Sequence, residues 1–132
     1  MLKKIIHTDQ APKAVGPYSQ AVKFADFLFC SGQISIDPKT QDVFTGDIKI
    51  QTEMVLKNIQ AVLLESEMNF SDVIKTTIFL TSMSDFSIVN EIYATKFKVD
   101  PPARSTVAVS ALPKGVNVEI EVIAYKKTNN SD

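Results

Sequence analysis

Cysteine and histidine are nearly absent from this chain of 132 residues, which has one of each. The lone Cys30 cannot form a disulfide within the chain, and its apolar neighbours indicate a buried thiol in a reducing compartment. One cysteine and one histidine cannot supply the ligands of a zinc site, so we expect no metal. His7 matches no functional pattern and is interpreted as a surface residue.

A surplus of charge and long apolar runs are missing as well. Fourteen lysines and arginines stand against 15 acidic residues, a formal net charge of −1, so no basic excess favours binding to a phosphate backbone. The apolar runs span only a few residues, too few to cross a membrane. Met1–His7 has two lysines but no apolar core behind them, unlike a secretory signal. We therefore expect a cytoplasmic protein.

What remains is the composition of an ordinary soluble domain, 45% hydrophobic and 22% charged. The length fits one domain over residues 1–132, with a polar tail at 126–132 that we expect to fray. Apolar periodicity and turn residues predict the elements in order. They are a short strand at 5–7, an antiparallel pair at 18–24 and 27–31, a helix from about 50 to 66, a strand at 73–80, a helix from 84–85 to Pro101, and strands at 104–109 and 118–125.

Both predicted helices have an apolar stripe. The first places Val55, Ile59 and Val62 inward, and Thr52 or an earlier residue is expected to cap it. The stripe of the second helix runs through Phe86, Val89, Tyr93 and Phe97. Two helices covering one face of a mixed sheet give an α+β layer architecture. The other face would be partly apolar, which favours a partner subunit.

The segment Asp100–Val109 carries an arginine in a defined setting. Pro101 and Pro102 restrict the backbone before Arg104, which is expected as the first residue of the strand that follows. A guanidinium held there is suited to a planar carboxylate or a phosphate. The alternative is an arginine whose stem covers the edge of the core and whose head lies in water.

Several short patterns coincide along the chain. They are Ala14–Gln20 (AVGPYSQ), Ser31–Gln33 (SGQ), Asp85–Asn90 (DFSIVN), Pro102–Ser105 (PARS) and Ile120–Ala124 (IEVIA). In this order and at this spacing they resemble the RidA (YjgF) family of imine deaminases over nearly the whole chain. The resemblance implies a chorismate-mutase-like α+β subunit in a homotrimer whose sites lie between subunits. It also implies hydrolysis of 2-iminopropanoate and 2-iminobutanoate, reactive products of pyridoxal-phosphate dehydratases, to 2-keto acids and ammonia without cofactor or metal.

The same resemblance implies roles for individual residues. Arg104 corresponds to the arginine that binds the substrate carboxylate, and Glu119 to the carboxylate that handles the attacking water. Thr106 stands where many relatives have cysteine. The residues implied to contact or orient substrate, besides Arg104, are Tyr18, Ser31, Gly32, Asn90 and Thr106.

The residues alone leave other roles open. Glu119 could be a solvated carboxylate on the outer face of a strand. Glu121 lies on the same face of that strand and is the rival candidate for the carboxylate that activates water. Tyr18 could be a half-buried aromatic, Ser31 could bond only to backbone, and Asn90 could face solvent. Two other functions stay open: a trimer that binds 2-keto acids without turnover, and RNA cleavage, which has been attributed to some family members.

Overall fold

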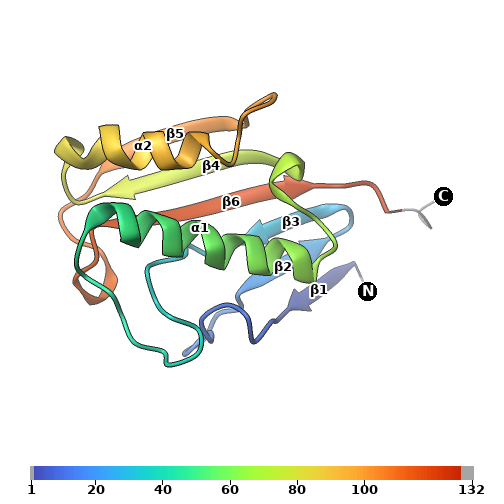
Figure 1. Cartoon of the computed structure of the whole chain (residues 1–132). Coiled ribbons are helices and arrows are strands. Elements are labelled where there is room, and N and C mark those ends of the chain that lie inside the picture. The colour runs from blue at the N-terminus through green and yellow to red at the C-terminus, as the bar shows by residue number, and fades with distance from the viewer. Residues whose placement is uncertain (1, 129–132) are drawn as a thin grey trace.

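A six-stranded mixed sheet forms the body of the protein in the computed structural model, which describes residues 2–128. The strand order is β1-β2-β3-β6-β4-β5; β4 and β5 pair in parallel, and the other neighbours pair antiparallel. Both α-helices lie on the same face of this sheet (Figure 1), which confirms the predicted α+β architecture. The bounds are β1 Lys3–Ile6, β2 Ala21–Phe24, β3 Phe27–Cys30, α1 Ile48–Glu65, β4 Val73–Leu80, α2 Phe86–Ala94, β5 Ala103–Ala108 and β6 Val118–Tyr125.

Strands β4 and β6 occupy the predicted ranges and pair in the middle of the sheet. Along β6, Val118 and Ile120 are fully buried beneath the helices, while Glu119 and Glu121 point to the other face. Strand β5 begins at Ala103, so Arg104 is its second residue rather than its first. The tail after β6 starts with bonds to the β2–β3 turn: the backbone amide of Lys126 donates to the Asp26 carbonyl oxygen at 3.1 Å. Residues 129–132, the rest of the predicted frayed tail, lie outside the described residues.

Helix α1 buries the predicted apolar stripe but starts two residues earlier than expected. Its cap is Asp47, whose carboxylate accepts from the amides of Lys49 at 2.7 Å and Ile50 at 3.3 Å. Thr52 lies inside the helix instead, and its hydroxyl donates to the Ile48 carbonyl at 2.8 Å. An acidic cap also suits the positive end of the helix dipole, which explains why the start falls at Asp47.

Helix α2 is shorter than predicted, because it ends at Ala94 and not at Pro101. The Thr95 hydroxyl bonds to the Ile92 carbonyl at 2.6 Å, and the amides of residues 95–97 turn back to carbonyls three residues earlier. This tighter turn ends the helix before the proline is reached. Phe97 follows the helix yet stays buried, with its ring centroid 4.5 Å from that of Tyr93.

The face of the sheet away from the helices exposes several aromatic rings. Phe27 contacts Tyr125 at 5.0 Å between centroids and Phe29 at 6.3 Å, and all three side chains remain 39–46% exposed. Ile5 and Phe24 extend the same face along β1 and β2. We call this surface the open face. Its apolar character matches the prediction made from the sequence.

Candidate active site

A cavity of about 380 Å³ opens beside the N-terminal end of β6 and holds four of the predicted site residues. Tyr18 and Ser31 line it from the segments flanking the β2–β3 hairpin, together with Gly32 and with Glu119 of β6. The neighbouring Pro12, Lys13, Gln20, Gln33, Ile34, Ile36, Pro113 and Lys114 complete the wall. The cavity therefore gathers one carboxylate, one phenol and one hydroxyl at a single concave place.

Gly32 makes room for the Glu119 side chain. A Cβ atom at position 32 would overlap the Glu119 carboxylate, so any larger residue would displace it. Glycine is therefore required at position 32 by the close approach of a side chain.

Burial raises the pKa of the Glu119 carboxyl above its usual value, and the nearby charge of Glu121 raises it further. Glu119 is only half-buried, so water can still reach it. A carboxylate with a raised pKa that remains accessible to water is better suited to accept a proton and return it.

The other polar groups of the cavity are held by local backbone. The Ser31 hydroxyl donates to the Ser19 carbonyl at 2.7 Å, which leaves its oxygen lone pairs available to accept a bond. Tyr18 follows a tight turn in which its amide donates to the Gly16 carbonyl at 2.9 Å, with Gly16 at φ 118°. The Tyr18 ring is 54% exposed, as in the half-buried alternative.

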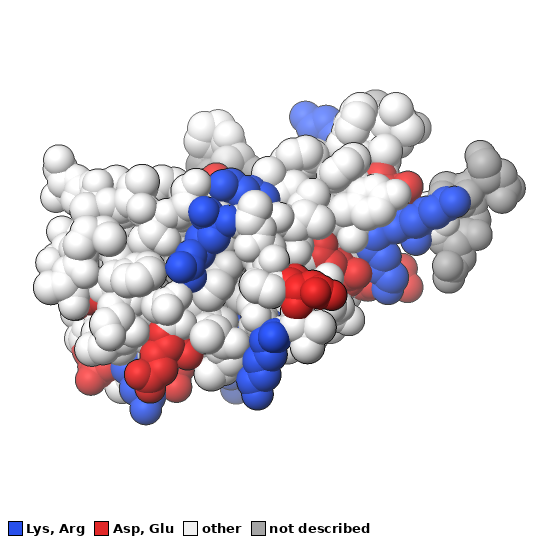
Figure 2. Space-filling view, turned by 90° about the horizontal axis from the view of Figure 1, so that it is seen from above, with Lys and Arg blue, Asp and Glu red and all other residues white. Residues whose placement is uncertain are grey.

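Arg104 lies elsewhere, beside α2. Its Nη1 donates to Asn90 Oδ1 at 2.6 Å, and its guanidinium lies 5.4 Å from the Phe86 ring centroid and 5.0 Å from that of Tyr93. Two predicted site residues, Arg104 and Asn90, are thereby brought together. Seen from the edge where β5 and α2 lie, a broad uncharged area covers the upper left of the view, and basic and acidic side chains are interspersed elsewhere (Figure 2).

Thr106 shares a face of β5 with Arg104, and its Oγ1 is buried without a hydrogen-bond partner. Such a buried hydroxyl is unusual, because most find a partner within the protein or in water. Thr106 and Arg104 thus form a second polar group near α2.

Arg104 and Glu119 project from opposite faces of the sheet. Arg104 is paired in register with Thr76, whose hydroxyl bonds at 2.7 Å to the Tyr93 hydroxyl of α2, so both project toward the helices. Glu119 alternates with the buried Ile120 and therefore projects to the open face. Within one chain, the guanidinium and the carboxylate cannot meet around one small substrate.

Reasoning from the sequence missed four polar residues of the cavity: Lys13, Gln20, Gln33 and Lys114. Gln20 is buried, and its amide bonds to backbone 8 to 12 residues earlier, a pairing that no local pattern reveals. Lys114 lies in the turn before β6, and its place in the same cavity as Glu119 follows only from the fold. Within residues 2–128, no three His, Cys, Asp or Glu side chains are arranged to hold a metal ion. In the same range, no helix combines the length and apolarity needed to cross a bilayer.

Comparison with known proteins places this architecture among close relatives. The family model described as endoribonuclease L-PSP matches residues 8–126. A RutC family protein of Pyrococcus horikoshii is 53% identical over 126 residues, covering 96% of this chain and all of that protein. The 2-iminobutanoate/2-iminopropanoate deaminase of Mus musculus is 43% identical over 126 residues, covering 96% of this chain and 93% of its own. A Rid family protein of Yersinia pestis superposes with a TM-score of 0.92 at 55% identity, covering 94% and 99% of the two chains.

Proposed function

The chain belongs to the endoribonuclease L-PSP family, which contains the RidA (YjgF) proteins, and from this premise we propose that it hydrolyses reactive 2-imino acids. The proposed substrates are 2-iminopropanoate and 2-iminobutanoate, and the products are 2-keto acids and ammonia. This activity would remove the reactive imines and enamines that pyridoxal-phosphate dehydratases release. The mouse relative, whose name states this reaction, supports the assignment.

The Glu119 carboxylate in its cavity is the observation that carries the proposal. Hydrolysis of an imine begins when water adds to the C=N carbon and loses a proton while the nitrogen gains one, giving a carbinolamine. The carbinolamine then collapses to a C=O group as its hydroxyl loses a proton and its protonated nitrogen leaves as ammonia. Glu119, with its raised pKa, is suited to take the proton from water and deliver it to the departing nitrogen.

The substrate carboxylate needs a cation, and we assign this role to Arg104 of a neighbouring subunit. The Asn90 contact holds the guanidinium in place, and a bidentate fork suits a planar carboxylate. Because Arg104 and Glu119 occupy opposite faces, one chain would contribute the arginine and the next chain the carboxylate. The apolar open face favours the homotrimer that such sharing requires.

The compartment that we propose is the cytoplasm, on the basis of the free thiol. Cys30 is buried, and burial raises its pKa to about 12, which keeps it a neutral thiol. A lone reduced cysteine is typical of reducing compartments.

We expect Arg104→Ala to remove at least about 99% of imine hydrolysis, because loss of a charged anchor weakens both binding and orientation. An amino-acid oxidase would generate the imine, and semicarbazide would trap what the enzyme leaves. The matched variant Arg104→Lys keeps the charge without the fork and should retain an intermediate rate. Size-exclusion chromatography and circular dichroism would show that both variants fold as the wild type does.

Undiminished hydrolysis by Arg104→Ala would contradict the assignment. If the wild type leaves the imine untouched while 2-keto acids raise its melting temperature, the protein is a binding or regulatory protein instead.

RNA cleavage is the second candidate, since the matching family is described as an endoribonuclease. The net charge of −1 offers little attraction for a phosphate backbone. RNA degradation that persists through purification and disappears with Arg104→Ala would favour this candidate.

A further inference from the structure

The charged residues that line the cavity are Lys13, Lys114 and Glu119. With Glu119 ionised they leave a surplus of one positive charge, and the proposed arginine from a neighbouring subunit would raise it to two. An imino acid with an alkyl side chain offers one carboxylate, which the arginine would satisfy. The two lysines are thus more than a monocarboxylate requires.

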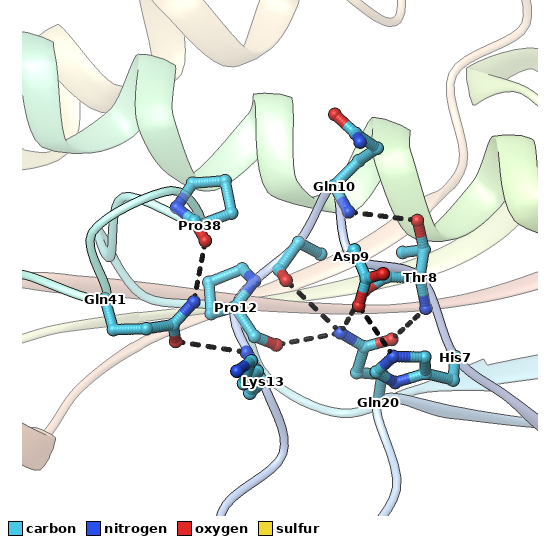
Figure 3. Close-up of polar contacts among 10 residues, drawn as sticks. His7, Thr8, Asp9, Gln10, Pro12, Lys13, Gln20, Pro38 and Gln41 are labelled. Atoms are coloured by element: carbon cyan, nitrogen blue, oxygen red, sulfur yellow. Dashed lines mark hydrogen bonds and ion pairs between the residues drawn. The ribbon is translucent and has the colours of Figure 1, made fainter.

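Lys13 is attached to a fixed part of the chain. The Gln20 amide donates to the Pro12 carbonyl at 2.8 Å and to the Thr8 carbonyl at 2.9 Å, and it accepts from the Thr8 amide at 2.7 Å. Gln41 accepts from the Lys13 amide at 3.2 Å, and its own amide donates to the Pro38 carbonyl (Figure 3). The lysine side chain is exposed, but its backbone is held at the rim of the cavity by two glutamines.

Lys114 lies in an unfavourable backbone conformation on the wall formed by the turn before β6. Its φ is 57°, in the left-handed region that glycine and asparagine tolerate better, and Gly115 follows at φ 75°. Residues held in this region tend to be found where function requires them. The same turn leads into β6, which carries Glu119 five residues later.

We infer that Lys13 and Lys114 bind a second acidic group, so that the cavity selects 2-imino acids and 2-keto acids whose side chain ends in a carboxylate. The inference rests on the proposed function and narrows its substrate class to include imines derived from acidic amino acids. Size agrees with this class: cavities of about 300 Å³ and above take ligands larger than a three-carbon acid, and this one measures about 380 Å³.

The test compares binding of two 2-keto acids, because binding does not depend on turnover. Titration calorimetry would measure 2-oxoglutarate against 2-oxobutanoate on the wild type and on Lys13→Gln and Lys114→Asn. Asparagine is chosen at 114 because it removes the charge and accepts the left-handed backbone. We expect the wild type to prefer 2-oxoglutarate, and each variant to reduce that preference about fivefold, the effect of one lost charge pair near the surface. Lys57→Gln, on the exposed face of α1, should leave the preference unchanged.

A preference ratio near one in the wild type would overturn the inference. An equal loss of affinity for both acids in the variants would also overturn it, since the lysines would then serve the carboxylate that both ligands share. Hydrolysis of imines made by oxidases from alanine and from aspartate is measured in parallel. If neither imine is hydrolysed but the binding preference is present, the proposed function fails and the assignment of the lysines stands.

Discussion

Among the single residues, Glu119 combines half-burial, a nearby like charge and access to water. As a base it must be ionised, so kcat/KM should fall as the pH drops through its raised pKa. Glu121→Gln removes the second cause of that shift and should move the acidic limb of the pH profile to lower pH. This would be checked by measuring kcat/KM between about pH 4 and 8 for the wild type, for Glu121→Gln and for the exposed control Glu53→Gln. An acidic limb that stays in place in Glu121→Gln would contradict it.

The same carboxylate should cost the protein stability at neutral pH. Its pKa in the folded state lies above the reference value of 4.5, so the folded state holds the proton more tightly than the unfolded chain does. The Glu119 carboxyl therefore stabilises the folded state at low pH, and this contribution to stability is lost as the pH rises through the folded-state pKa. Glu119→Gln should raise the melting temperature at pH 7, with a gain that vanishes near pH 4, while it abolishes hydrolysis. A lower melting temperature at pH 7 would show that the carboxylate is stabilising.

Among the elements, the loop over residues 8–13 depends most on one buried side chain, Gln20, while Gln41 adds a bond to the Lys13 amide. Gln20→Ala would remove the partner of the Thr8 amide and of the carbonyls of Thr8, Ala11 and Pro12, so we expect a loss of about 3 kcal/mol in the free energy of unfolding. Urea denaturation would measure it. Gln10→Ala, an exposed residue of the same loop, should change stability by no more than about 0.5 kcal/mol. Equal losses in the two variants would rule out the proposed role of the buried amide.

Elements with strong local signals could be predicted from the sequence, and elements set by distant contacts could not. Strands β4 and β6 were placed correctly because turn residues bound them and their apolar alternation is strong. The end of α2 was placed too late because Phe97 continues the apolar spacing, although it is buried by a turn after the helix. The cap of α1 was predicted only as Thr52 or an earlier residue, because several polar residues precede the helix and only the backbone geometry selects Asp47.

The candidate site follows the same rule: what local patterns determine could be predicted from the sequence, and what distant contacts determine could not. Alternation indicated that Ser105 and Thr106 point to different faces of β5, but no pattern in the sequence says which face the helices cover. The register of β4 against β5 decides it, and so places Arg104 away from Glu119. Lys13 reaches the cavity only because Gln20 and Gln41 fold its loop back, through bonds that span 8 to 28 residues.

For the assembled protein, the separation of Arg104 from Glu119 predicts how mixtures of two variants behave. Chains with Arg104→Ala and chains with Glu119→Gln should each be inactive alone. When they are co-refolded in equal amounts, about one quarter of the shared sites would combine an intact arginine with an intact glutamate. The imine assay should therefore recover about a quarter of wild-type activity. Light scattering should give three times the chain mass of 14.6 kDa.

The matched control for this experiment is a chain that carries both substitutions. Mixed with Arg104→Ala chains it supplies no intact arginine, so the activity should stay at the background level. If the single-variant mixture is equally inactive, both groups must act within one chain or not at all.

The division of one sheet into two unlike faces also bears on how much activity a cell obtains from each copy of the protein. If the site is shared between subunits as proposed, a chain newly released from the ribosome carries both Arg104 and Glu119 but not a complete site. Its activity begins only when neighbours dock. At low abundance, halving the number of chains would then reduce imine clearance by more than half, because assembly depends on concentration. The level of expression would set the rate per molecule as well as the number of molecules.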